Sequence, residues 1–253
     1  MVDRTGRQLD TTLLVTLAAS FVAGLLLWNT WVLWPFRLLV VLMHESGHAA
    51  ATLLVGGSVD RIQIAANEGG FTLSRLEPSL WRQIVVSSAG YVGSTVSGCV
   101  LLWIAARSRS ARWPLFALAA WTSAVALLWV RDAFTLLFVA GCAVALVLIA
   151  RAGPVLLRRG LLVFLATFSV SYALYDIKDD LLHFTSRGPS DAEALAHATF
   201  IPAVVWGIGW GAVSLALVAL TLRHVVASGR AVRSLGTEPL ASGPPDYRRG
   251  LMR

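Results

Sequence analysis

Two histidines and a glutamate interrupt an otherwise apolar stretch, VVLMHESGHAAATLLVGG, at residues 40–57. His44 and His48 are four residues apart, so on an α-helix they share one face, and both imidazoles can reach one metal ion. Glu45 follows the first histidine directly and completes the pattern H-E-x-x-H. In this pattern the histidines hold zinc, and the glutamate takes a proton from the metal-bound water, which then attacks a carbonyl. The stretch therefore predicts one zinc ion per chain, with Glu45 as the general base.

The apolar surroundings strengthen this interpretation. Ionisable groups inside a membrane-spanning helix are costly unless they are paired or hydrated, so three of them within five residues need a shared partner. A zinc ion is such a partner. The alternative is that the histidines only pack against neighbouring helices and that Glu45 is their buried structural partner.

A catalytic zinc needs a third protein ligand and one open position. Four ionisable side chains form a polar stripe on one helix face in the stretch SYALYDIKDDLLHF at 171–184: Asp176, Asp179, Asp180 and His183. Asp176 lies deepest in its apolar segment, as the two histidines do in theirs, so Asp176 is the expected third ligand. Asp180 and Asp132 stay open as alternatives, whereas the position of Asp191 predicts that it lies too close to the membrane surface.

The whole chain has the composition of an all-α polytopic membrane protein. Of its 253 residues 57% are hydrophobic and 14% are charged. A bilayer core of about 30 Å takes about 20 helical residues to cross. We expect about seven such helices, with six or eight as alternatives, at 12–34, 36–55, 82–106, 113–130, 132–150, 160–183 and 200–224. They form one domain over 1–224, followed by a disordered basic tail at 225–253.

Arginines predict the orientation of the chain in the cell membrane. They cluster at 107–112, at 151–159 and after residue 222. Seven alternating segments put these three regions on one side, which the positive-inside rule makes the cytoplasm. The C-terminus is then cytoplasmic and the N-terminus is outside. This distribution also accounts for the net charge of +7, so we expect no nucleic-acid partner.

Two further segments have recognisable patterns. Residues 58–75, SVDRIQIAANEGGFTLSR, alternate apolar and polar side chains around an Asn-Glu-Gly-Gly turn, which is typical of a β-hairpin. Small residues recur at 87–98, SSAGYVGSTVSG, which predicts a close approach of two helix backbones. We therefore expect a short membrane-associated hairpin after the H-E-x-x-H helix, and then a helix with a closely packed neighbour.

The sequence resembles the site-2 protease family of intramembrane zinc metallopeptidases, and within it the compact bacterial branch of site-2-protease-like membrane proteins. The similar stretches are HESGH at 44–48, TLLVGGSVDRIQI at 52–64, GGFT at 69–72, SSAGYVGS at 87–94 and, more loosely, SDAEALAHATFIPAVVWGIGW at 190–210. The resemblance covers about residues 36 to 224. Better-known members carry the third ligand in an Asn-Pro-x-Pro-x-x-Asp-Gly-like stretch, and this sequence contains no Asp-Gly pair.

The resemblance implies a multi-pass enzyme of the bacterial inner membrane. In it His44, His48 and a later aspartate hold zinc, and Glu45 is the general base. The resemblance also implies that the hairpin at 58–75 receives the unwound substrate as an added strand.

The leading functional hypothesis is an intramembrane zinc endopeptidase that hydrolyses a peptide bond in or near a transmembrane segment of a membrane protein. Its partners are then the lipid bilayer and that substrate. One alternative is a non-proteolytic membrane protein that keeps a metal site for stability or partner binding, with no open coordination position. The other is an ion- or proton-coupled transporter, which predicts a continuous polar pathway through several spans.

Overall fold

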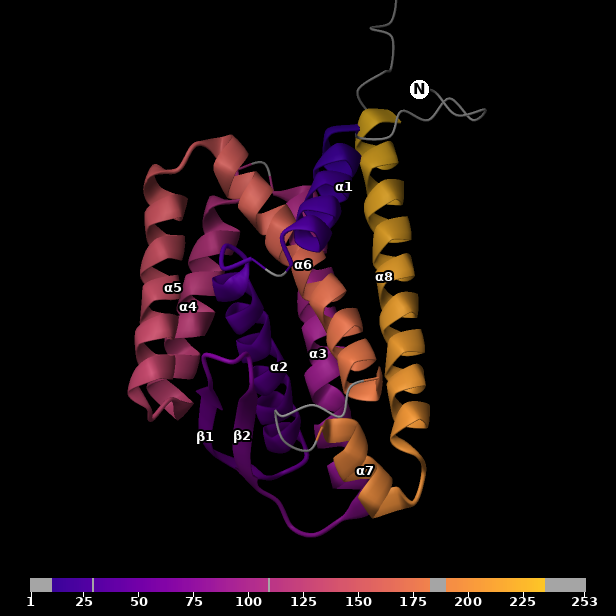
Figure 1. The fold of residues 1–253 in the computed structure, drawn as a ribbon. Coiled ribbons are helices and arrows are strands. Elements are labelled where there is room, and N and C mark those ends of the chain that lie inside the picture. Colours follow the sequence, from indigo (N-terminus) through magenta and orange to yellow (C-terminus); the bar gives the residue numbers. More distant parts are fainter. Residues whose placement is uncertain (1–10, 29, 109, 183–189, 235–253) are drawn as a thin grey trace, which may run out of the picture.

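The computed structural model describes residues 11–28, 30–108, 110–182 and 190–234. Within these ranges the chain forms eight helices and one two-stranded antiparallel sheet (Figure 1). The elements, in chain order, are α1 (Thr11–Leu26), α2 (Trp34–Leu54), β1 (Ser58–Ile64), β2 (Gly70–Arg75), α3 (Leu80–Arg107), α4 (Arg112–Trp129), α5 (Ala133–Ala152), α6 (Val155–Leu182), α7 (Asp191–Thr199) and α8 (Ala203–Ser234). The predicted fold class, a helical membrane protein with a β-hairpin after the motif helix, is confirmed.

Four helical segments are long and apolar enough to cross a membrane, judged by length and composition within the described ranges. They are Leu80–Arg107, Ala133–Ala152, Val155–Tyr172 and Ala203–Val225. Seven of the eight helices overlap the seven expected segments, although α1 ends at Leu26 rather than at residue 34, and α7 is additional. The count of seven crossings is not confirmed by these four candidates and stays a prediction. The last helix continues to Ser234, beyond the expected boundary at residue 224.

The directions of the helices show at which end of the bundle each helix begins and ends. Figure 1 shows that α3, α5 and α8 end at the same end of the bundle, so the arginine-rich regions lie together. The first helix, α1, begins at this end too, and α2 runs in the same direction as α1. The orientation of the two termini relative to a membrane stays a prediction.

Helix α2 lies at the centre of the protein. Leu38, Val40 and Leu42 in its first half are completely buried. Its start carries proline in the first turn, where the missing N–H has no helical partner to lose. Its end is followed by Gly56, whose φ of +84° is a left-handed conformation that glycine adopts without strain. The chain then turns directly into β1.

The turn of the hairpin is fixed to the start of α2. Glu68 in this turn has a left-handed backbone, with φ of +67°. Its carboxylate forms an ion pair with Arg37, with 2.8 Å between Oε1 and Nε, and both side chains are largely buried. The indole nitrogen of Trp34 donates a hydrogen bond to the carbonyl of Ala66, at 2.9 Å. These two contacts set the position of the hairpin relative to α2.

The outer edge of β1 contacts the connection between α4 and α5. Ile62 forms an isolated parallel bridge with Val130. The hydroxyl of Thr135 accepts a hydrogen bond from the N–H of Ile64 at 3.0 Å and donates one to its carbonyl at 3.1 Å. The other edge of the sheet is formed by β2, and both strands contact α2.

Candidate metal centre

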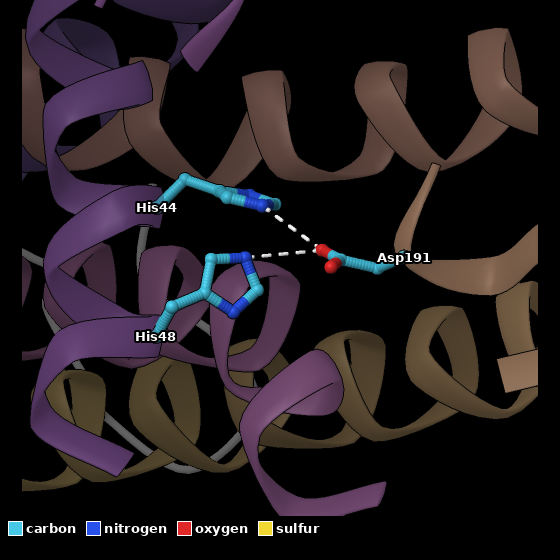
Figure 2. A group of neighbouring side chains, drawn as sticks. All are labelled: His44, His48 and Asp191. Carbon is cyan, nitrogen blue, oxygen red and sulfur yellow. Dashed lines mark hydrogen bonds and ion pairs between the residues drawn. The ribbon is translucent and has the colours of Figure 1, made fainter. Parts of the chain in front are cut away.

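Two imidazoles and one carboxylate meet beside α2. His44 and His48 lie on one face of this helix, and their ring centroids are 4.8 Å apart. Figure 2 shows both rings directed at Asp191. The Nε2 atoms of His44 and His48 are 3.2 Å and 3.1 Å from Oδ2 of Asp191. The possible ligand atoms of the three residues all lie within 4.8 Å of one another, and no other such group occurs in the part of the chain that the structure describes.

Asp191 is the first residue of α7, a short helix between α6 and α8. Ser190 caps this helix: its hydroxyl accepts from the N–H of Glu193, and its own N–H donates to the Glu193 carboxylate. The prediction that Asp191 lies too close to the membrane surface is wrong, because α7 packs against α3 and α8 and brings its N-terminus to the histidines. The capping-box pattern S-D-A-E was a usable signal for a helix starting there.

The other proposed ligands have different outcomes. Asp132 is the N-cap of α5, where its Oδ1 accepts from the N–H of Thr135 at 2.9 Å, and it is not part of the histidine group. The side chains of Asp176 and Asp180 lie outside the described residues. Asp176 as a zinc ligand therefore stays a prediction.

Helix α3 forms one wall of the centre, and it does so with backbone. A Cβ atom on Gly90 would lie 2.3 Å from Nε2 of His44 and 2.6 Å from Nε2 of His48. A Cβ atom on Gly47 of α2 would lie 2.2 Å from a carbonyl oxygen of α3. The predicted close approach of two helix backbones is thus found between α2 and α3, and it brings α3 directly over the imidazoles.

The same wall orients one of the histidines. Nδ1 of His48 is 2.7 Å from the carbonyl oxygen of Val86 in α3. Because a carbonyl can only accept, Nδ1 carries the hydrogen, and in neutral His48 the lone pair then lies on Nε2. This is the usual arrangement of a metal-binding histidine, whose second nitrogen is fixed by an outer hydrogen bond.

Asp191 is the anionic member of the group. Burial alone would raise the pKa of its carboxyl group, but His48 and His44 outweigh this effect and lower that pKa below its usual range. Asp191 is consequently ionised at neutral pH, as a metal ligand must be.

The sequence model of the peptidase M50B-like family matches residues 17–221. The chain belongs to this family. The resemblance to site-2 proteases is thereby confirmed, and membership indicates a metallopeptidase of the intramembrane type; M50 peptidases are zinc-dependent in general. Together with its apolar helices, it also indicates a multi-pass membrane protein. Comparison with curated proteins and with solved structures gives no match.

In this M50B-like peptidase the hairpin forms the second wall of the site. Glu45, only 5% exposed, borders a cleft of about 430 Å³ together with the two histidines and Asp191. Strand β2 runs along the same cleft, where Phe71 and Leu73 are 41% and 46% exposed. The histidine–aspartate group, Glu45 and strand β2 therefore share one space.

Proposed function

We propose that this M50B-like peptidase is an intramembrane zinc endopeptidase that hydrolyses a peptide bond in or near a transmembrane segment of another membrane protein. One observation carries the proposal: His44, His48 and Asp191 converge in a cleft that Glu45 also borders. A purely structural metal site has no need of a buried carboxylate beside its ligands.

The donor set fits zinc. Two imidazole nitrogens and one carboxylate oxygen are a common ligand set of catalytic zinc, and three protein ligands leave one position open. The hydrogen bond between Nδ1 of His48 and the Val86 carbonyl leaves Nε2 as the ligand atom, and Asp191 supplies a negative charge. When bound, zinc supplies the positive charge that polarises the scissile carbonyl and makes water more acidic. We therefore assign Asp191, rather than Asp176, as the third ligand.

Glu45 is the proposed general base. It takes the proton of the attacking water and later gives a proton to the amine that leaves, which is the ordinary exchange in general acid–base catalysis. Its burial in the cleft keeps bulk water away from the carboxylate. The hydroxyl of Thr72 donates to it at 2.8 Å, so the carboxylate has a fixed neighbour.

Strand β2 is the proposed binding site for the substrate backbone. A transmembrane helix hides its peptide carbonyls in its own hydrogen bonds, so it must unwind before hydrolysis. An extended segment can then add to a free strand edge, where main-chain hydrogen bonds hold it. Phe71 and Leu73 offer apolar contacts for its side chains along the cleft.

Metal analysis and cleavage together test the proposal. Zinc is measured by mass spectrometry on detergent-purified wild type, Asp191→Asn, Asp176→Asn and Glu45→Gln. Cleavage is measured on a single-span reporter with Gly and Pro in its apolar segment and a fluorophore and quencher at its ends. We expect Asp191→Asn to lose zinc and cleavage, Asp176→Asn to keep zinc, and Glu45→Gln to keep zinc but lose cleavage.

The opposite results have definite meanings. Zinc lost from Asp176→Asn and kept by Asp191→Asn would make Asp176 the third ligand. A wild-type protein without zinc would contradict the endopeptidase. Zinc retained with no cleavage that depends on Glu45 would favour the non-proteolytic alternative.

A further inference from the structure

Thr72 of β2 contacts the acidic residue of the motif twice. Its hydroxyl lies 2.8 Å from Oε2 of Glu45 and 2.9 Å from the backbone carbonyl oxygen of the same residue. A hydroxyl has one hydrogen to donate, so the two acceptors share it. Thr72 thus bridges the carboxylate of Glu45 and the backbone of α2 at the same residue.

Gly70, two residues before Thr72, has no side chain and so leaves the space that Glu45 fills. A Cβ atom on Gly70 would lie 2.6 Å from Oε1 of Glu45 and 2.9 Å from Cγ1 of Val41. One carboxylate oxygen therefore lies against the bare backbone at Gly70, while the other accepts from Thr72. Strand β2 contacts both oxygens of the carboxylate.

The strand that makes these contacts is itself held in place. Its turn is tied to α2 by the ion pair of Arg37 with Glu68, and its partner strand is tied to α5 by Thr135. A rigid strand can orient a flexible side chain, whereas a mobile loop cannot.

We infer that Thr72 is a positioning residue that holds the carboxylate of Glu45 in the orientation needed for proton transfer. The inference rests on the proposed function, in which Glu45 is the general base. A glutamate side chain has three rotatable bonds, and a hydrogen bond from a fixed strand selects one arrangement before substrate arrives. The edge that accepts the substrate is then also the element that orients the base.

A purely structural role makes a different prediction, and β2 contains a matched contact to separate the two. Ser74 lies two residues beyond Thr72, and its hydroxyl is 3.0 Å from the hydroxyl of Thr52 in α2. It joins the same strand to the same helix without touching Glu45. If Thr72 only attaches β2 to α2, loss of either hydroxyl should have the same effect.

The test uses acetohydroxamate, which binds an accessible metal ion and shares its proton with a nearby carboxylate. Its affinity is measured from the visible absorption of the cobalt-substituted, full-length protein in detergent, and so needs no substrate. The variants are Thr72→Val, which keeps the shape of the side chain, Thr72→Ser, which keeps the hydroxyl, Ser74→Ala and Glu45→Gln. Metal content is measured for each.

We expect Thr72→Val to keep its metal and to bind acetohydroxamate about tenfold more weakly, approaching Glu45→Gln, because a charge-assisted hydrogen bond is lost. Thr72→Ser and Ser74→Ala should stay close to wild type. Wild-type affinity in Thr72→Val, loss of its metal, or failure of Thr72→Ser to restore binding would each overturn the inference and leave the proposed function standing. If metal-loaded wild type does not bind acetohydroxamate, or Glu45→Gln binds it equally well, the proposed function fails as well.

Discussion

The two walls beside α2 position different parts of the site by different means. Helix α3 meets the imidazoles with backbone at Gly90, where there is no room for one additional carbon atom. Strand β2 meets Glu45 with the hydroxyl of Thr72 and the open space at Gly70. The spacing of the motif sends the two histidines to one wall and the glutamate to the other. We therefore expect that the proposed metal binding and the proposed proton transfer can be disrupted separately.

The largest effect is expected at the α3 wall. In Gly90→Ala the new methyl group would overlap both Nε2 atoms, so the imidazoles must move away from the position where they meet Asp191. We expect zinc affinity to fall by at least about 10- to 100-fold, as for other changes that disturb ligand orientation. Zinc content after dialysis against a weak chelator measures this loss.

Gly141→Ala in α5 is the control for the α3 wall, because a Cβ atom on Gly141 would meet no other atom within 4 Å. It should keep zinc. Its free energy of unfolding, measured by thermal unfolding in detergent, should be unchanged or raised by up to about 1 kcal/mol. Full zinc retention in Gly90→Ala would show that the α3 wall does not position the ligands.

At the β2 wall the effect should be confined to catalysis. Gly70→Ala pushes mainly the Glu45 carboxylate, the nearest atom and the end of a flexible side chain, and also a methyl group of the buried Val41. We expect zinc to be retained and cleavage of the single-span reporter to fall about 100-fold, since a displacement of about 1 Å can cost that much. In Gly69→Ala the Cβ atom would meet only the Asn67 side chain, at 3.2 Å, so this variant is the control. Loss of zinc from Gly70→Ala would show that the β2 wall also positions the metal ligands.

A smaller effect is expected behind the β2 wall. Thr135→Val removes both hydrogen bonds to Ile64, which is 1% exposed, and leaves its N–H and carbonyl without this partner. We expect the free energy of unfolding, measured by thermal unfolding in detergent, to fall by about 1–3 kcal/mol. Thr122→Val is the control, because the Thr122 hydroxyl bonds only to a carbonyl of its own helix. Equal losses in the two variants would mean that Thr135 does not anchor β1.

The smallest effect is expected behind the α3 wall. Trp210 of α8 donates to the hydroxyl of Ser88 at 2.9 Å and stacks on Tyr91, whose ring meets the edge of His44. Trp210→Phe keeps an aromatic ring and loses the hydrogen bond. We therefore expect the free energy of unfolding to fall by about 1 kcal/mol, with zinc retained. Ser88→Ala should cost about the same, and the double variant no more than either, because both remove one interaction. Additive losses would show that the bond contributes nothing.

Sequence alone predicted the local parts of this site. His44, Glu45 and His48 are read from one helical turn, and the hairpin from its alternating pattern and Asn-Glu-Gly-Gly turn, because both depend on neighbours in the chain. The close helix contact followed from small residues at 87–98 for the same reason. Local geometry is encoded within about ten residues.

The long-range parts could not be obtained in this way. Asp191 is 147 positions from His44, and depth in a span is a poor guide when a short helix such as α7 lies between two spans. The role of Thr72 had only one signal, its place in the similar stretch GGFT. Its contact with Glu45 depends on how the hairpin folds back along α2, which no local pattern contains.

The connection between α4 and α5, together with the start of α5, covers one edge of the small sheet. A bare strand edge is a template on which extended chains stack, and proteins commonly protect such edges. Here Val130 and Thr135 bond to the outer edge of β1 at Ile62 and Ile64. No further strand can be added on that side. An incoming chain could therefore be added only along β2. Under the proposed function, a substrate segment can therefore join the sheet from one side only, the side of β2 that borders the cleft.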